Sequence, residues 1–217
     1  MTIKAVGRAV LGEINRPAAS YRLRRYLRAH PPPYRLQVGS GTVERAGWLN
    51  TDIGPRARYW LDIGHQFPFP DGSVSRVFAE HVVEHVPPAV VASFLRETRR
   101  ILSADGILRI LTPDAEATAR AYADRSPAAY DLMRRAARLG YPSHHLVDIL
   151  NLTFHANGHV YIWDEASLRG VLTDAGFSRV ERCRVGESAD PELAAMDGHF
   201  APGDPAIPFT LALEAQP

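Results

Sequence analysis

The chain has 217 residues, with 25 lysine and arginine residues against 24 aspartate and glutamate residues. This length predicts one domain with at most a small appendage. The single cysteine, Cys183, excludes an internal disulfide and fits a reducing compartment, so we expect a cytoplasmic protein. No apolar run approaches the roughly 18 residues that cross a membrane, and no secretory signal is expected.

Residues 1–33 form a basic leader that ends in three consecutive prolines. Its residues 1–30 carry seven basic side chains and one acid, whereas the remainder of the chain is slightly acidic. We favour a helix whose apolar residues cover the core, and the alternative is weak contact with an anionic membrane surface or glycan. A nucleic-acid partner is not expected, because the basic residues are not interleaved with aromatic ones in a groove.

Residues 34–53 carry the most informative pattern. An apolar strand runs into Gly39-Ser40-Gly41, and the next strand ends on Asp52. Glycines let the backbone approach a ligand closely, and a carboxylate at the tip of the neighbouring strand can accept hydrogen bonds from ribose hydroxyls. The pair therefore predicts a nucleoside site at the carboxyl ends of parallel strands.

The spacing within this pattern indicates which nucleoside binds. A dinucleotide motif requires a third glycine, which is missing, and Asp52 follows Gly41 by only eleven residues. A crossover helix needs about a dozen residues, and a ligand without phosphate needs no helix dipole. S-adenosylmethionine is such a ligand. A tight turn with a capping aspartate is the structural alternative, and a nicotinamide oxidoreductase is a weaker one.

Strands and helices alternate along the rest of the chain, which predicts a parallel α/β sheet. A helix begins at Pro87-Pro88 and is closed by residues 104–106, and another begins at the N-cap Asp164. Residues 186–206 are polar and rich in proline and glycine, so we expect a loop beside the site. Strands are predicted at 58–63, 74–79, 107–111, 177–185 and 209–214, and mostly helical structure at 115–158 with a break at 140–142.

Taken in order, these motifs resemble the class I S-adenosylmethionine-dependent methyltransferases, and most closely a bacterial branch of that superfamily. The resemblance extends over residues 34–215. It rests on the segments 38–41, 47–52, 67–73, 80–85, 99–106, 109–114, 158–159 and 186–190.

The resemblance implies a Rossmann-like, doubly wound α/β fold with a seven-stranded, mostly parallel sheet whose last strand is antiparallel. The methyltransferase domain is then 34–217, with residues 115–163 as a helical cover of the acceptor site. It further implies an enzyme that uses S-adenosylmethionine and releases S-adenosylhomocysteine. The implied cofactor-binding residues are Val38, Gly39, Ser40, Gly41, Asp52, Ile53, Asp62, Ile63, Glu80 and His81.

Methyl transfer from a sulfonium depends mainly on positioning, but an alcohol acceptor must also lose a proton. His81 is the first candidate for the base, because the resemblance places it beside the transferable methyl. His145, His159 and Tyr161 are further candidates, and for each the alternative is a hydrogen-bonded structural role. We expect O-methylation of a small metabolite or glycan hydroxyl, while the oligomeric state stays open.

Two other functions are consistent with parts of the sequence. His81-Val-Val-Glu84-His85 matches the His-x-x-Glu-His pattern of zinc peptidases, which requires one continuous helix. A strand leads directly into this segment and two prolines follow it, so we expect no metal ligands here. A non-catalytic, methyltransferase-like module that binds a nucleoside is the other alternative.

Overall fold

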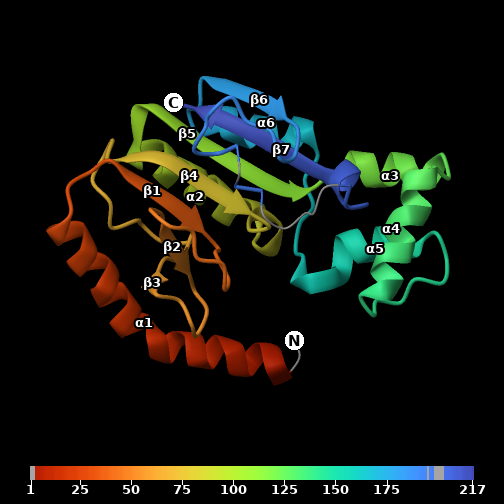
Figure 1. Cartoon of the computed structure of the whole chain (residues 1–217), viewed down its shortest axis with the longest axis horizontal. Helices are drawn as coiled ribbons and strands as arrows, with labels where there is room; N and C mark the ends of the chain where they lie inside the picture. Colours follow the sequence, from red (N-terminus) through yellow and green to blue (C-terminus); the bar gives the residue numbers. More distant parts are fainter. Residues whose placement is uncertain (1–2, 195, 198–202) are drawn as a thin grey trace.

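The computed structural model describes residues 3–194, 196–197 and 203–217, with the backbone alone for residues 3–10. Residues 1–2 of the predicted leader, and 195 and 198–202 of the predicted loop, lie outside the described residues. Within the described residues, seven strands form one sheet in the order β3-β2-β1-β4-β5-β7-β6 (Figure 1). They are β1 (Tyr34–Val38), β2 (Leu49–Asp52), β3 (Tyr59–Trp60), β4 (Val74–Glu80), β5 (Leu102–Pro113), β6 (Arg179–Cys183) and β7 (Thr210–Gln216).

The strand directions confirm the predicted fold class. Strands β1 to β5 pair in parallel, and β7 pairs antiparallel with both β5 and β6. Val38 pairs with Thr51 on one side and with Ala79 on the other. Asp52, Gly39 and Glu80 therefore follow one another in this order along the same edge of the sheet, which we call the carboxyl rim.

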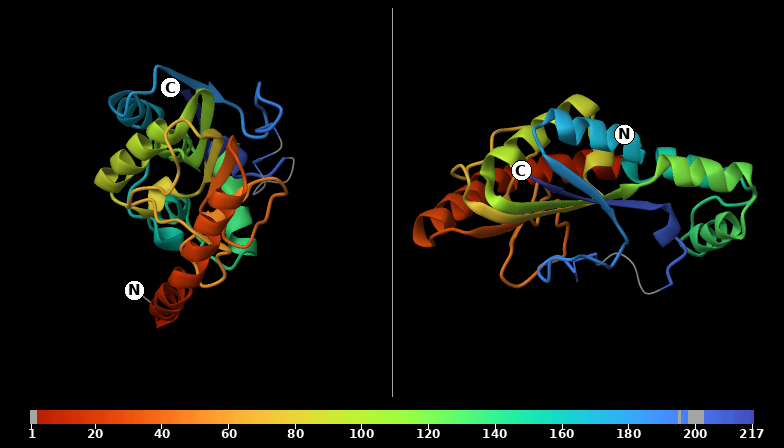
Figure 2. Two further views of the ribbon diagram at one scale, coloured as in Figure 1. Left: turned by 90° about the vertical axis from the view of Figure 1, so that its left-hand side faces the viewer. Right: turned by 90° about the horizontal axis from the view of Figure 1, so that it is seen from above.

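Successive side chains along each strand point to opposite faces of the sheet. Leu36 and Val38 of β1 and Val77 and Ala79 of β4 belong to the main core, together with Leu108 of β5. The helices α2 (Pro88–Ile101) and α6 (Glu165–Asp174) cover this face, as Figure 2 shows. The apolar stripe of α2 includes Val91, Phe94, Leu95 and Ile101, all fully buried.

The opposite face of the sheet is covered by irregular chain. Phe78, Leu111 and Ala212 pack there against Leu193 and Met196 of the segment that follows β6. Figure 2 shows this segment on the side of the sheet away from α2 and α6. The predicted loop at 186–206 thus supplies part of the core.

Arginine side chains from the strands hold this segment in place. Arg76 of β4 donates from Nη2 to Asp190 Oδ2 at 2.7 Å. Arg109 of β5 is fully buried and pairs with both Asp197 and Glu214. The covering segment is therefore attached by ion pairs as well as by apolar contacts.

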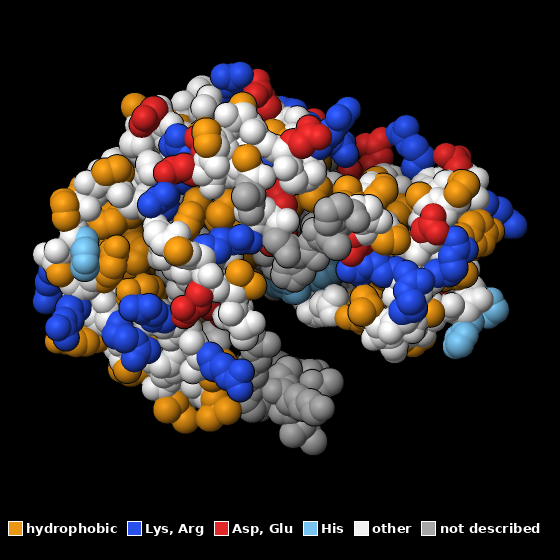
Figure 3. Space-filling model, viewed as in Figure 1, with side chains coloured by type: hydrophobic (Ala, Val, Ile, Leu, Met, Phe, Trp, Pro, Cys, Tyr) orange, Lys and Arg blue, Asp and Glu red, His pale blue; other side chains and the backbone are white. Residues whose placement is uncertain are grey.

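The helices α3 (Ala115–Ala123), α4 (Pro127–Arg138) and α5 (Asp148–His155) form a lobe beyond the carboxyl rim (Figure 1). We call it the helical lobe. A separate apolar cluster holds it together, formed by Ala129, Leu132, Ile149 and Phe209. The space-filling view shows a hollow between this lobe and the body of the molecule (Figure 3). The predicted helix break at 140–142 falls between α4 and α5.

The leader forms helix α1 (Ile3–Ala29), which lies against β3. Ala19 and Leu23 are buried there, and Arg22 donates from Nε to the carbonyl of Arg58 at 2.8 Å. None of the helices in the described part of the chain combines the length and hydrophobicity that crossing a bilayer requires.

Several element boundaries differ from the predictions. The strand predicted at 58–63 is limited to Tyr59–Trp60, and the strand predicted at 107–111 extends over Leu102–Pro113. Helix α2 ends at Ile101 rather than at 104–106, because Leu102 turns to extended backbone and pairs with Val74. Tertiary pairing with β4 decides this boundary.

Candidate active site

The glycine turn and Asp52 lie in direct contact at the carboxyl rim. Gly41 donates its backbone N–H to Asp52 Oδ2 at 2.9 Å, and the N–H of Gly54 donates to Asp52 Oδ1 at 2.5 Å. Ser40 is held by a bond from its N–H to the carbonyl of Thr51 at 3.0 Å. The carboxylate thus faces the turn, and each oxygen retains a second lone pair.

The two glycines of the turn have different surroundings. Gly39 has φ +65°, and a Cβ added there would lie 2.5 Å from Val82 Cγ2. Gly41 has φ +58°, and a Cβ there would meet no atom within 4 Å. Gly39 therefore permits close packing against the chain after β4, whereas Gly41 borders open space.

Replacement of Gly39 by alanine is expected to lower the free energy of unfolding by about 2–3 kcal/mol. About 1–2 kcal/mol comes from left-handed backbone, and about 1 kcal/mol from overpacking against Val82. Gly41→Ala shares only the backbone cost, so urea unfolding of the two variants isolates the packing contribution. Equal losses in both variants would show that Val82 moves aside without cost.

A cavity of about 290 Å³ opens beside the turn, lined by Gly41, Thr42, Asp52 and residues 54–57. Ile53 is 54% exposed next to it and offers an apolar surface. Asp62 lines a different cavity, of about 150 Å³, between α1 and the chain after β3, and Ile63 is buried in the main core. The structure thus brings Asp52 together with the glycine turn but places Asp62 and Ile63 apart from that cavity.

At the end of β4 the chain enters a strained turn. Glu80 is buried, and His81 adopts φ 54°, a left-handed conformation that is uncommon for a residue with a side chain. The N–H of His81 donates to the carbonyl of Leu111 at 2.9 Å. Such strained backbone tends to occur at functional sites.

Glu84 is the centre of a hydrogen-bond network below this turn. Its side chain is fully buried, with Oε1 2.7 Å from His81 Nδ1 and Oε2 accepting from Thr112 Oγ1 at 3.1 Å. Burial raises the pKa of Glu84, but the hydrogen bond and charge of His81 outweigh it and hold the pKa below its ordinary value. The ionised carboxylate only accepts, so His81 Nδ1 carries the proton.

His159 approaches this network from the segment that follows α5. The carbonyl of Glu84 accepts from the N–H groups of Val160 at 2.7 Å and Tyr161 at 3.2 Å. The ring of His159 lies edge-on to that of His85, with centroids 5.1 Å apart. Burial lowers the pKa of His159 below its ordinary value, so the ring is neutral near pH 7.

Tyr161 and His145 are the two remaining predicted catalytic residues. The ring of Tyr161 packs on Trp163 with centroids 4.6 Å apart. His145 is exposed before α5, where its N–H donates to Asp148 Oδ2 at 2.9 Å. His145 and His159 lie beyond opposite ends of α5, which spans roughly 12 Å at 1.5 Å per residue, so the structure places these two candidates apart.

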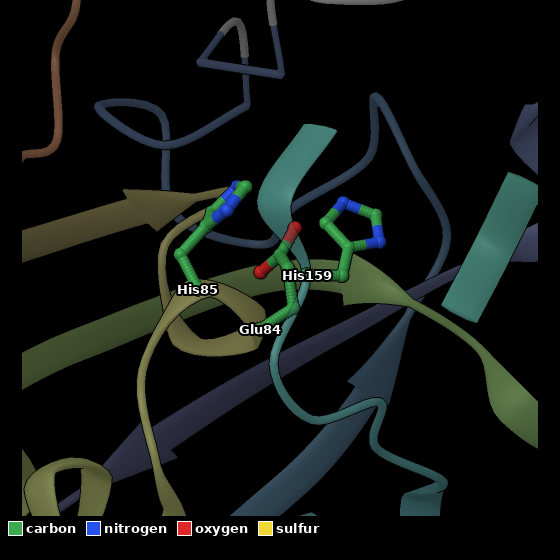
Figure 4. A group of neighbouring side chains, drawn as sticks. All are labelled: Glu84, His85 and His159. Atoms are coloured by element: carbon green, nitrogen blue, oxygen red, sulfur yellow. The ribbon is translucent and has the colours of Figure 1, made fainter. Parts of the chain in front are cut away.

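The structure also defines a group that the sequence prediction did not assemble. Ligand atoms of Glu84, His85 and His159 all lie within 4.8 Å of one another, and Figure 4 shows the Glu84 carboxylate between the two rings. The zinc-peptidase pattern paired His85 with His81 instead. That pattern needs one helix, whereas only Val83–His85 form a short 3-10 helix here. The His-x-x-Glu-His pattern already contained Glu84 and His85, but no pattern in the sequence joined them to His159.

Comparison with known proteins finds similarity to methyltransferases. Residues 54–110 match the family model described as "Methyltransferase domain", a segment that contains His81 and Glu84 but begins after Asp52. No curated protein matches the chain. A SAM-dependent methyltransferase from Archaeoglobus fulgidus is similar in structure, with TM-score 0.50, 17% identity, and 93% of this chain and 94% of that chain covered.

A SAM-dependent methyltransferase from Thermotoga maritima, described as a possible histamine N-methyltransferase, gives TM-score 0.50 at 12% identity. The similarity covers 95% of this chain and 91% of that chain. At these identities the likeness concerns the fold.

The strand order and the antiparallel β7 define the Rossmann-like fold of the class I methyltransferases. Residues 54–110, about a quarter of the chain, are therefore similar to a methyltransferase domain in sequence, and the whole chain is similar to S-adenosylmethionine-dependent methyltransferases in fold.

Proposed function

We propose that this chain is an S-adenosylmethionine-dependent methyltransferase that acts on a hydroxyl oxygen of a small metabolite or glycan. The observation that supports an oxygen acceptor is the pair formed by His81 and Glu84 at the end of β4. A hydroxyl must lose its proton as the O–CH₃ bond forms, whereas a neutral amine attacks without prior deprotonation. A histidine held by a buried carboxylate is suited to remove that proton.

We propose that the donor lies over the glycine turn, with its ribose hydroxyls on Asp52. The open space beside Gly41 and the cavity lined by Asp52 support this placement. When bound, S-adenosylmethionine supplies a methyl group on a sulfonium, which is a good leaving group. Positioning by the turn and the rim then supplies most of the catalysis. Val38, Ser40, Ile53, Glu80 and His81 complete the proposed set of donor contacts, whereas Asp62 and Ile63 lie apart from this cavity.

His81 is the proposed catalytic base. Its Nδ1 donates to Glu84, so in the neutral ring the lone pair lies on Nε2. As the S–CH₃ bond breaks and the O–CH₃ bond forms, Nε2 takes the hydroxyl proton. His159 and Tyr161 belong to the segment that is hydrogen-bonded to the carbonyl of Glu84, and His145 is assigned no direct role.

The helical lobe, within residues 115–163, is proposed to cover the acceptor. It lies beyond the carboxyl rim, across the hollow in Figure 3. Helix α1 belongs to the proposed 1–33 leader, although its Leu23 packs in the main core.

Replacement of His81 by glutamine is expected to lower turnover by about 10²- to 10⁴-fold, because the acceptor proton is no longer removed. Affinity for S-adenosylhomocysteine is expected to change less than turnover, since the base acts on the acceptor. His144→Gln is the matched control, because His144 is exposed on the helical lobe. Unchanged turnover in the His81→Gln variant would contradict the proposed role of His81 as the catalytic base.

An unbiased screen identifies the acceptor. The protein is incubated with a metabolite extract and a donor that carries a ¹³C-labelled methyl group, and labelled products are found by mass spectrometry. Labelled O-methyl products support the proposal, whereas N-methyl or C-methyl products contradict it. Donor binding without any labelled product would favour the non-catalytic module.

A further inference from the structure

Glu84, His85 and His159 form a compact group of potential metal ligands, which we call the histidine cluster. Each contributes one ligand atom, and these atoms all lie within 4.8 Å of one another. Glu84 and His85 come from the turn after β4, whereas His159 comes from the segment after α5, about 75 residues later. Figure 4 shows the three side chains converging from these two segments.

The hydrogen bond on one ring nitrogen of His159 determines which nitrogen can bind a metal. His159 Nδ1 lies 2.6 Å from the carbonyl oxygen of Thr153. A carbonyl only accepts, so Nδ1 carries the proton and Nε2 keeps the lone pair that a metal requires. Histidines that bind metals commonly donate their other ring N–H to a carbonyl or carboxylate in this way.

The carboxylate of Glu84 is oriented from both sides. Oε1 bonds to His81 Nδ1 and Oε2 accepts from Thr112 Oγ1. Each carboxylate oxygen has a second lone pair, so these bonds orient the group without exhausting its acceptor capacity. Orientation of this kind is typical of carboxylates that bind metals.

Hydrogen bonds between the two segments fix the distance between them. The carbonyl of Glu84 accepts from the N–H groups of Val160 and Tyr161, and Trp163 Nε1 donates to the carbonyl of Val83 at 3.3 Å. His159 therefore cannot move away from Glu84 without loss of several hydrogen bonds. The ligand set is held together before any ion binds.

We propose that Glu84, His85 and His159 bind one Zn²⁺ ion. Two imidazoles and one carboxylate suit Zn²⁺, whereas Mg²⁺ and Ca²⁺ prefer oxygen ligands alone. Three protein ligands leave a coordination position open, as in catalytic rather than structural zinc sites. This position is expected to receive an oxygen of the acceptor, a part of the inference that rests on the proposed function.

The metal site is tested without donor or acceptor, so its failure is distinguishable from a failure of the proposed function. The full chain is freed of metal by dialysis against a chelator and titrated with Zn²⁺ by calorimetry. We expect one ion per chain. His85→Ala and His159→Ala are expected to weaken binding by about 100-fold or more, because loss of residues that merely orient a ligand already costs 10- to 100-fold.

His144→Ala is the control, since His144 is exposed and lies outside the cluster. Glu84 is fully buried and its replacement can prevent folding, so the two partly exposed histidines carry the test, with circular dichroism to verify that each variant folds. Absence of Zn²⁺ binding to the original chain would overturn the site. Binding that is unchanged in both histidine variants would place the ion elsewhere and overturn it equally.

The open position is tested with Co²⁺ in place of Zn²⁺. The visible absorption bands of the Co²⁺-loaded chain are expected to shift when acetohydroxamate, an oxygen ligand, is added. Unchanged bands would show that the coordination is closed and would overturn a role in binding the acceptor.

Discussion

Replacement of Arg109 by methionine is expected to lower the free energy of unfolding by about 3–5 kcal/mol, the usual cost of removing one partner from a buried ion pair. Arg109 is fully buried in the middle of β5. Its Nε donates to Asp197 Oδ1 at 2.8 Å and its Nη1 to Glu214 Oε1 at 2.7 Å. Without the guanidinium, two poorly hydrated carboxylates lie side by side with no compensating charge.

Urea unfolding measures this effect, with Arg179→Met as the matched control. Arg179 pairs with Glu181 on the surface of β6, where the two side chains are 62% and 56% exposed. Exposed pairs contribute about 0–1 kcal/mol, so the control is expected to change little. A similar small change in both variants would contradict the importance of the buried network.

The same Arg109 variant is expected to loosen the segment after β6. Arg109 Nη2 also donates to the carbonyl of Arg184 at 3.1 Å, and the N–H of Gly186 bonds to Asp197 Oδ2 at 2.5 Å. Amide hydrogen exchange around residues 184–194 should therefore accelerate more than exchange in α2. Uniform acceleration would indicate global rather than local destabilisation.

Replacement of Asp52 by alanine is expected to weaken binding of S-adenosylhomocysteine by about 2–4 kcal/mol, or roughly 30- to 1,000-fold. The physical reason is the loss of two hydrogen bonds from the ribose hydroxyls to a charged acceptor. Titration calorimetry measures the change. Asp71→Ala is the matched control, because Asp71 is an exposed carboxylate in a turn and pairs with Arg100.

Asp52 also bonds to the N–H groups of Gly41 and Gly54, so a loss of affinity alone could reflect a disturbed turn. A 2′-deoxy analogue of S-adenosylhomocysteine separates the two explanations. The original chain should bind this analogue more weakly than S-adenosylhomocysteine, whereas Asp52→Ala should distinguish the two much less. Equal discrimination by both proteins would refute the ribose contact.

Features set by neighbouring residues were predictable from the sequence. Asp164 was predicted as an N-cap, and its Oδ1 accepts from the N–H of Ser167 at 2.8 Å within a capping box. Gly176 follows the last turn of the same helix with φ +95°, a backbone conformation that glycine adopts at low cost. Pro88 begins α2 as expected. Capping and turn chemistry depend on residues a few positions apart, so the local sequence contains the necessary information.

Features set by distant partners were not predictable in the same way. Residues 107–111 of β5 are apolar apart from Arg109, whose partner Asp197 lies 88 residues further along the chain. The extension of β5 to Leu102 requires Val74 of the neighbouring strand. No local pattern specifies which remote residue meets a given side chain.

The sequence by itself determined the class of fold and the candidate donor site at Gly39, Gly41 and Asp52, because strand periodicity, glycine turns and strand ends are read from short windows. Only the tertiary structure decided that His159 joins Glu84 and His85, and that the sheet face around Phe78 is covered by the chain after β6. These contacts depend on how parallel strands and their long connections place remote segments side by side. Sheet order and packing determine that placement, and local sequence does not.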